Sequence, residues 1–189
     1  MSYRFDGKVC LITGAASGIG RATAQKMASL GAALALSDIN KAGVAETNML
    51  CGGGHMVELL DVGSSQACDT FVDAVVSRLG RLDYVFNCAG VNPTAYALTD
   101  TTDAYFDKLM NANVRGTYNM TRAAMPHLKA GAAIVNTSSI MGLNVSAQYA
   151  IYCATKFAIV GFTKAMAMEL GPSQVRVNAI AVRPSQSET

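Results

Sequence analysis

The chain has 189 residues, of which 51% are hydrophobic and 15% are charged, and its formal net charge is +2. Lysines and arginines are dispersed rather than gathered in basic blocks, which argues against a nucleic-acid-binding protein. A high apolar content with few charges is typical of strands that are buried on both faces of a sheet. We therefore expect residues 1–189 to form a single domain around one core.

The five cysteines are odd in number and never form a C-x-x-C pair. A disulfide framework and a zinc site are therefore both disfavoured, and reduced core thiols in an intracellular protein are the simpler interpretation. Residues 2–7 are polar and charged, unlike a signal peptide. The apolar stretch 150–168 is interrupted by Lys156 and Lys164, which argues against a membrane span. We expect a cytoplasmic protein with no metal and no membrane partner.

Short apolar runs alternate along the chain with longer helical patterns, as in βαβ units. The expected strands are residues 8–12, 32–37, 55–59, 82–86, 132–137 and 175–181. The expected helices end near residue 30, cover 41–50, run from a Ser64 cap to Gly80, and cover 102–128 and 148–170. We expect the fourth of these to be broken near residues 111–113 and ended by Pro126.

Six such strands with right-handed crossovers predict an α/β fold, a doubly wound parallel sheet between two layers of helices. In folds of this class, ligands bind at the carboxyl ends of the strands. Five polar or glycine positions fall at such ends, and they are Gly14, Asp38, Asp61, Asn87 and Ser139.

Gly14, Gly18 and Gly20 follow the first strand and open a helix. Missing side chains let the backbone approach a pyrophosphate, and the helix N-terminus offers free N–H groups and partial positive charge. Glycines here could merely tighten a strand-to-helix turn. Asp38, eighteen residues past Gly20, favours a dinucleotide site instead.

Asp38 ends the second strand, where a carboxylate can accept hydrogen bonds from an adenosine ribose. The same charge would repel a 2′-phosphate, so the sequence predicts NAD rather than NADP. Arg21 and Lys41 lie close in sequence and could favour NADP. The alternative is that both are ordinary cations on helix surfaces.

Tyr152 and Lys156 are four residues apart, which places them on one face of a helix. An ammonium close to a phenol stabilises the phenolate, so we expect Lys156 to lower the pKa of Tyr152. Ser139 adds a hydroxyl that can hold a substrate oxygen. Tyr149 could line the same site or simply pack, and the apolar stretch 141–145 is assigned weakly to the substrate.

Together these motifs resemble the short-chain dehydrogenase/reductase family over nearly the whole chain. They are Thr13-Gly-x-x-x-Gly-Ile-Gly20, Asn87-x-Ala-Gly90, Asn113, Ser139 and Tyr152-x-x-x-Lys156. The resemblance implies a Rossmann fold, NAD as cofactor, and an oxidoreductase that interconverts a secondary alcohol and a ketone by hydride transfer.

The resemblance also implies roles for single residues. Tyr152 matches the general acid/base, Lys156 the lysine that binds the nicotinamide ribose, and Ser139 the serine that holds the substrate oxygen. Asn113 matches the asparagine that kinks its helix and supports a proton path to the lysine. The implied cofactor contacts are Gly14, Ser17, Gly18, Ile19, Gly20, Asp38, Ile39, Asp61, Val62, Asn87, Ala89, Gly90, Tyr152 and Lys156.

After residue 180 the chain departs from the family pattern, which usually continues with a Pro-Gly turn, a substrate lid, another helix and a seventh strand. We therefore expect the lid and the last strand to be absent. A second interpretation follows, in which the chain is a catalytically weak module that binds NAD or dimerises. The resemblance further suggests a homodimer or homotetramer, formed through the helices around residues 102–128 and 148–170.

Overall fold

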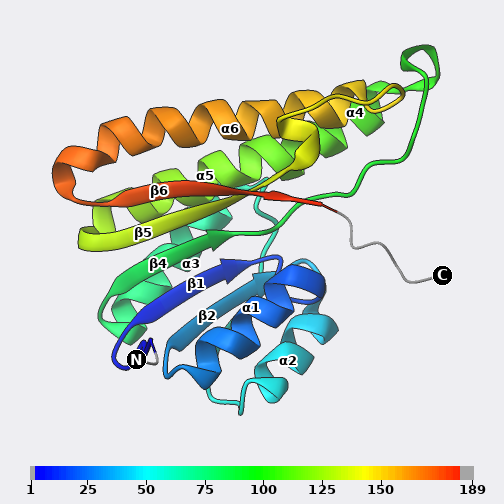
Figure 1. Ribbon diagram of the computed structural model, residues 1–189. Helices are drawn as coiled ribbons and strands as arrows, with labels where there is room; N and C mark the ends of the chain where they lie inside the picture. Colours follow the sequence, from blue (N-terminus) through cyan, green and yellow to red (C-terminus); the bar gives the residue numbers. More distant parts are fainter. Residues whose placement is uncertain (1–2, 184–189) are drawn as a thin grey trace.

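The computed structural model describes residues 3–183, which form one central sheet with helices packed on both of its faces (Figure 1). All six strands run parallel, in the order β3-β2-β1-β4-β5-β6. The predicted doubly wound parallel sheet is therefore confirmed. Residues 184–189, in the part of the chain that departs from the family pattern, lie outside the described residues.

The elements follow the expected alternation. The strands are β1 (Val9–Thr13), β2 (Ala33–Asp38), β3 (Met56–Leu59), β4 (Leu82–Asn87), β5 (Leu128–Ser139) and β6 (Arg176–Val182). The helices are α1 (Gly18–Ser29), α2 (Lys41–Leu50), α3 (Ser65–Leu79), α4 (Asp103–Leu109), α5 (Gly116–Ala124) and α6 (Ala150–Leu170).

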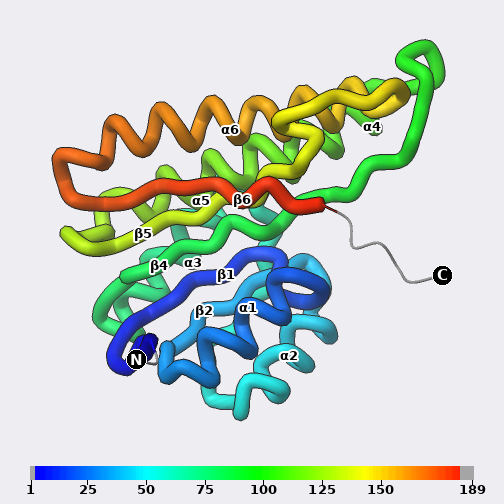
Figure 2. The backbone as a smooth tube through the Cα atoms, viewed as in Figure 1, coloured from blue at the N-terminus to red at the C-terminus, as the bar shows by residue number. Residues whose placement is uncertain are grey.

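Two apolar cores lie on opposite faces of the sheet, because successive side chains of a strand point to opposite sides. Leu11 of β1 belongs to the core formed with α3, α5 and α6, whereas its neighbour Ile12 belongs to the core formed with α1 and α2. Both side chains have no exposed surface. Figure 2 shows these two helix layers, with α5 and α6 on one side of the strands and α1 and α2 on the other.

Local signals set the ends of several helices. The Ser64 hydroxyl accepts a hydrogen bond from the N–H of Ala67 at the start of α3, and Gly80 ends that helix with a left-handed φ of 77°. The Asn40 side chain accepts from the N–H of Gly43 and caps α2 in the same way. These caps satisfy backbone donors that a helix start leaves free.

The helical region before β5 differs from the prediction. Residues Met110–Arg115 form a π-helical turn that joins α4 to α5, so the expected break is a local widening of one nearly continuous helix. The strand β5 begins at Leu128, earlier than expected. Its first residues bulge from the sheet, because pairing with β4 shifts register between Leu82 and Tyr84.

The last helix, α6, begins two residues later than the predicted start at 148. Gln148 has a φ of 67°, which lies outside the helical region, and Tyr149 is the N-cap. The carbonyl of Gln148 instead accepts a hydrogen bond from the N–H of Tyr96, at 3.0 Å. Residues 3–183 contain no helix of the length and apolar character that a bilayer crossing requires.

Candidate active site

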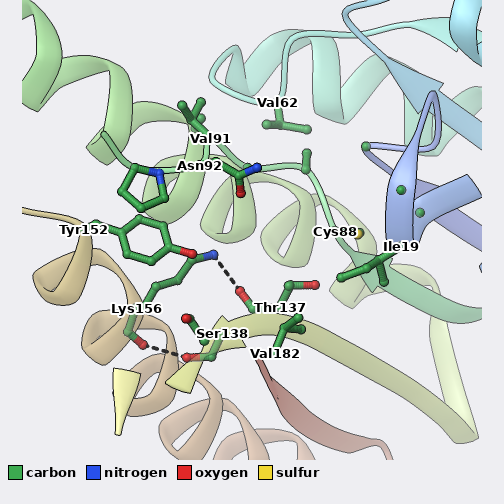
Figure 3. A pocket seen from close by; sticks show the side chains of 18 of the residues that line it. Ile19, Val62, Cys88, Val91, Asn92, Thr137, Ser138, Tyr152, Lys156 and Val182 are labelled. Atoms are coloured by element: carbon green, nitrogen blue, oxygen red, sulfur yellow. Dashed lines mark hydrogen bonds between the residues drawn. The ribbon is translucent and has the colours of Figure 1, made fainter. Parts of the chain in front are cut away.

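A cavity of about 770 Å³ opens where the carboxyl ends of the strands meet, as expected for this sheet topology (Figure 3). It brings together most of the residues singled out from the sequence. Those that line it are Gly14, Ser17, Gly18, Ile19, Gly20, Asp38, Ile39, Asp61, Val62, Ala89, Gly90, Ser139, Tyr152 and Lys156.

One end of the cavity is formed by the turn between β1 and α1. Gly14 has a φ of 67°, and a Cβ added there would lie 2.7 Å from the backbone nitrogen of Ala89. A Cβ added at Gly20 would overlap the carbonyl oxygen of Gly14. The N-cap residue Ser17 makes no side-chain hydrogen bond to the helix start, and the first turn holds no acidic residue. A turn with glycines at positions 14, 18 and 20, at the start of a helix, fits a pyrophosphate.

Asp38 lies at the end of β2, next to this turn. One carboxylate oxygen accepts a hydrogen bond from the N–H of Ala16, and the other accepts from the N–H of Asn40, each at 2.9 Å. Each oxygen keeps a free lone pair for a further donor. The carboxylate is therefore fixed at the cavity wall and can still accept hydrogen bonds from a diol such as a ribose.

Asp61 and Val62 follow β3 at the same end of the cavity. The Asp61 carboxylate accepts from the N–H of Gly63, at 2.8 Å, and its side chain is exposed. Val62 is 7% exposed and presents an apolar surface to the cavity. An apolar face beside a carboxylate suits the flat ring of a purine.

Tyr152 and Lys156 reach the other end of the cavity from the first turns of α6. The Lys156 ammonium lies 5.5 Å from the centre of the Tyr152 ring and donates a hydrogen bond to the carbonyl of Thr137, at 3.0 Å. Lys156 is only 5% exposed. Figure 3 shows both side chains directed into the cavity beside the end of β5.

The titration of this pair differs from the expectation. Burial raises the pKa of the Tyr152 phenol, an effect that the nearby Ser139 hydroxyl opposes. Burial also lowers the pKa of Lys156 to about 8, while a thiolate at Cys88 would act in the opposite direction. The expected lowering of the Tyr152 pKa by Lys156 is therefore not seen, because desolvation has the largest influence on both groups.

The buried ammonium gives a stability prediction. The pKa of Lys156 falls from 10.5 to about 8 on folding, so between these values the unfolded chain binds more protons and stability rises with pH. Below pH 8 the folded chain carries the full cost of the buried cation, about 3 kcal/mol. Lys156→Met should therefore raise Tm by several degrees at pH 7, less the loss of the bond to Thr137.

Differential scanning calorimetry across pH measures this effect. The Tm advantage of Lys156→Met should shrink as pH approaches 10.5, where the unfolded lysine also loses its proton. Lys164→Met is the matched control, since Lys164 is an exposed residue of the same helix and its removal should give no such gain. A Lys156→Met chain that melts below the wild type at pH 7 would contradict the argument.

Ser139 ends β5 and is 6% exposed. Its hydroxyl accepts a hydrogen bond from the N–H of Met141, at 3.2 Å, which fixes the side chain at the cavity wall. The preceding hydroxyl, of Ser138, donates to the carbonyl of Lys156, at 3.0 Å. This bond ties the strand end to α6, so Ser139 and Tyr152 are held on two directly connected elements.

Asn113 supports the site from below and does not line the cavity. It is 1% exposed and lies in the π-helical turn. Its amide oxygen accepts from the N–H of Val91, at 2.7 Å, and its amide nitrogen donates to the Thr155 hydroxyl, at 3.3 Å. Asn113 therefore connects the loop after β4 to α6, beside Lys156.

Asn87, an implied cofactor contact, also lies beneath the cavity wall. It is 3% exposed, and its amide nitrogen donates to Asn136 at 2.9 Å and to Thr121 at 3.1 Å. The structure thus gives it a place between β4, β5 and α5. The pleat of β4 points successive side chains to opposite faces of the sheet, and Asn87 lies on the face that α5 covers.

Several cavity residues were not singled out from the sequence. Cys88 lies between two implied contacts, and burial raises the pKa of its thiol. The motif Asn87-x-Ala-Gly90, in which Cys88 is the second residue, is the signal that could have identified it. The wall also includes Asn92, to which no sequence motif points, and Val182, which follows residue 181 at the carboxyl end of β6. Tyr149, for which two interpretations were open, does line the cavity.

Comparison with known proteins points to one group. A family model described as enoyl-(acyl carrier protein) reductase matches residues 14–188. The short-chain dehydrogenase/reductase ABA4 of Pyricularia oryzae is 36% identical over 182 residues, which cover 93% of this chain and 68% of that protein. D-threitol dehydrogenase of Mycolicibacterium smegmatis is 38% identical over 184 residues, with coverages of 95% and 70%.

A solved structure agrees with these matches. Carveol dehydrogenase from Mycobacterium avium, crystallised in complex with NAD, superposes with a TM-score of 0.91 at 32% sequence identity. The superposition covers 100% of this chain and 74% of that one.

Proposed function

Because the chain belongs to the short-chain dehydrogenase/reductase family, we propose that it is an NAD(H)-dependent oxidoreductase that interconverts a secondary alcohol and a ketone. One observation supports this most strongly. A single cavity contains both the glycine turn of β1–α1, with Asp38 beside it, and the group formed by Ser139, Tyr152 and Lys156. A dinucleotide-binding end and a proton-transfer end thus share one space.

The proposed cofactor contacts follow from the geometry of the first end. The N–H groups at the start of α1 would hold the pyrophosphate, and Asp38 would accept from the adenosine ribose. Asp61 and Val62 would contact the adenine, and Ala89 and Gly90 would lie beneath the nicotinamide half. When bound, NAD(H) would supply or accept the hydride.

The chain's own residues manage one proton and the substrate oxygen. Ser139 would donate a hydrogen bond to that oxygen, and Tyr152 would give it a proton in ketone reduction or remove one in alcohol oxidation. A phenol whose pKa is raised by burial keeps its proton at neutral pH, which suits the acid role. Lys156 would bind the nicotinamide ribose, and Asn113 would position the loop at Val91.

We propose a preference for NAD over NADP, which a titration tests. Asp38 lies at the ribose end, while Arg21 is held by Glu46 on α2, at 2.6 Å, and is not directed to the cavity. The wild-type chain should bind NADH at least about tenfold more tightly than NADPH, because the Asp38 carboxylate repels a 2′-phosphate. Isothermal titration calorimetry with both cofactors gives the two Kd values.

The matched variant is Asp38→Asn, which keeps an acceptor for the N–H of Ala16 but removes the charge. This variant should bring the Kd for NADPH closer to the Kd for NADH. Tighter binding of NADPH than of NADH by the wild type would contradict the role given to Asp38.

Self-association is part of the proposal, as a homodimer or homotetramer formed through α5 and α6. Apolar side chains are exposed on these helices, including Tyr118 at 45%, Phe157 at 43% and Met168 at 81%. A second copy would cover such surfaces. The single domain and the cytoplasmic location stay predictions. The alternative function, a catalytically weak NAD-binding module, differs from the proposed one in turnover alone.

A further inference from the structure

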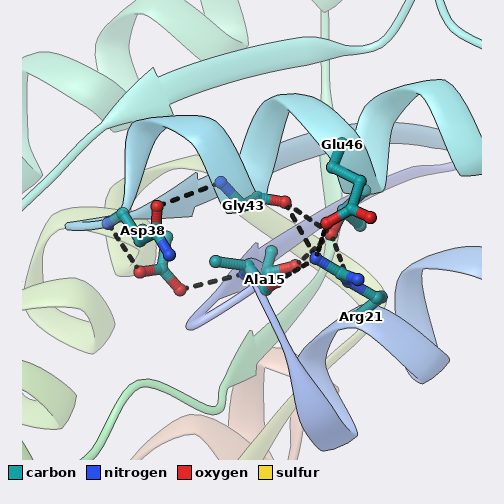
Figure 4. A network of polar contacts seen from close by, with 8 residues as sticks. Ala15, Arg21, Asp38, Gly43 and Glu46 are labelled. Carbon is teal, nitrogen blue, oxygen red and sulfur yellow. Dashed lines mark hydrogen bonds and ion pairs between the residues drawn. The ribbon is translucent and has the colours of Figure 1, made fainter.

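The turn between β1 and α1 is held by a set of hydrogen bonds from side chains of α1 and α2 (Figure 4). Thr47 of α2 has no exposed surface, and its hydroxyl oxygen lies 2.8 Å from the carbonyl oxygen of Ala15 and 3.0 Å from that of Gly43. We assign its single proton to the nearer acceptor, Ala15. Arg21 of α1 donates to the carbonyl of Ala16, at 2.5 Å, and to the Thr47 hydroxyl, at 3.0 Å. The carbonyls of Ala15 and Ala16 therefore both accept a hydrogen bond from a side chain.

The same stretch of backbone is also held by β2. The N–H of Ala15 donates to the carbonyl of Ser37, at 3.1 Å, and the N–H of Ala16 donates to Asp38, at 2.9 Å. The peptide that joins Ala15 to Ala16 is therefore fixed at both its carbonyl, by Thr47, and its N–H, by Asp38. A rotation of this peptide would break bonds to both α2 and β2.

The approach of α2 to the turn is unusually close. A Cβ added at Gly43 would lie 2.9 Å from the Cβ of Ala16 and 3.1 Å from its carbonyl oxygen. Arg21 also donates to the carbonyl of Gly43, at 3.3 Å, and pairs with Glu46. Glu46 is 61% exposed, so this ion pair contributes little, and the buried hydroxyl of Thr47 is the centre of the arrangement.

These contacts have an electrostatic consequence for an anion at the turn. A peptide carbonyl carries partial negative charge, and a carbonyl turned toward a pyrophosphate would repel it. Thr47 and Arg21 occupy the carbonyls of Ala15 and Ala16, so neither carbonyl is free to face an anion at the turn. They also keep Ala16 where its N–H orients Asp38.

We propose that Thr47 and Arg21 are positioning residues for dinucleotide binding, which act through the backbone of Ala15 and Ala16 and through Asp38. This inference rests on the proposed function, since it assigns a support to the same cofactor site. Neither Thr47 nor Arg21 belongs to the described residues that line the cavity. Any effect of either residue on cofactor affinity must therefore pass through the turn.

Calorimetric titration with NADH tests the inference on three variants of the full chain. Thr47→Val keeps the shape but removes the hydroxyl, and it should raise the Kd for NADH by about tenfold or more. Thr47→Ser keeps the hydroxyl and should restore a Kd within about threefold of the wild type. Thr163→Val is the control, because Thr163 is a buried hydroxyl of α6 that bonds Asn136, remote from the turn.

Thr163→Val should lose about as much stability as Thr47→Val, yet its Kd for NADH should equal that of the wild type. Folded Thr47→Val that binds NADH as tightly as the wild type would overturn the inference. If Thr47→Val does not fold, Arg21→Gln applies the same test, since the Arg21 side chain is 25% exposed and its loss is more easily tolerated. A wild-type chain that does not bind NADH would instead overturn the proposed function, which separates the two failures.

Discussion

Tyr152→Phe is expected to lower the turnover of a ketone by about a thousandfold or more while the Kd for NADH stays within about threefold. Only the hydroxyl is removed, and the half-buried aromatic ring is kept. Without the hydroxyl, the substrate oxygen loses its proton donor beside Ser139. Steady-state rates with saturating NADH, and calorimetric titration of the same sample, separate the two effects.

Tyr118→Phe is the matched control for this substitution. Tyr118 is an exposed tyrosine of α5 whose hydroxyl accepts a hydrogen bond from Arg122, and it does not belong to the cavity wall. Its loss should leave both turnover and NADH binding unchanged. Wild-type turnover in Tyr152→Phe would refute the role given to the phenol, whatever its effect on binding.

Gly20→Ala should abolish measurable NADH binding, with a Kd raised by about a hundredfold or more. The added methyl group would overlap the backbone carbonyl of Gly14, and backbone cannot move aside as a flexible side chain can. The turn between β1 and α1 would have to open, which displaces the N–H groups that hold the pyrophosphate. Titration with NADH and the Tm of the variant report binding and stability.

The control for Gly20→Ala is the same change at Gly161. Gly161 lies in α6, is exposed, and has open space where a Cβ would be added. Gly161→Ala should stabilise the chain by up to about 1 kcal/mol and leave NADH binding intact. A Gly20→Ala chain that binds NADH as the wild type does would show that the close approach at Gly14 is not needed.

The fold could be predicted well from the sequence because its signals are local. Buried strands read as apolar runs, and Ser64 and Gly80 mark the ends of α3 by hydrogen bonding and backbone conformation alone. The errors lie where tertiary contacts decide. A π-helical turn at Met110–Arg115 has no local signature, and its Asn113 is held by Val91 from another loop. Gln148 leaves the helix because its carbonyl bonds Tyr96.

Part of the site could also be predicted, because its motifs are local in the sequence. The glycine turn, Asp38, Ser139, Tyr152 and Lys156 belong to motifs that the sequence displays directly, and the cavity contains all of them. What the sequence does not display is how charge and burial act on them. Spacing alone predicts that Lys156 lowers the pKa of Tyr152, whereas burial raises it. The contacts of Arg21 with Thr47 and Glu46 are likewise not displayed by the sequence.

Hydride transfer itself is the most direct test of the proposed function. The purified chain is mixed with NADH and a panel of ketones, the disappearance of NADH is followed, and Tyr152→Phe serves as the blank. We expect at least one ketone to consume NADH catalytically with the wild type and at a rate lower by about a thousandfold with the variant. Tight NADH binding with no turnover of any ketone or, in reverse, of any secondary alcohol would contradict the proposal and favour the NAD-binding module.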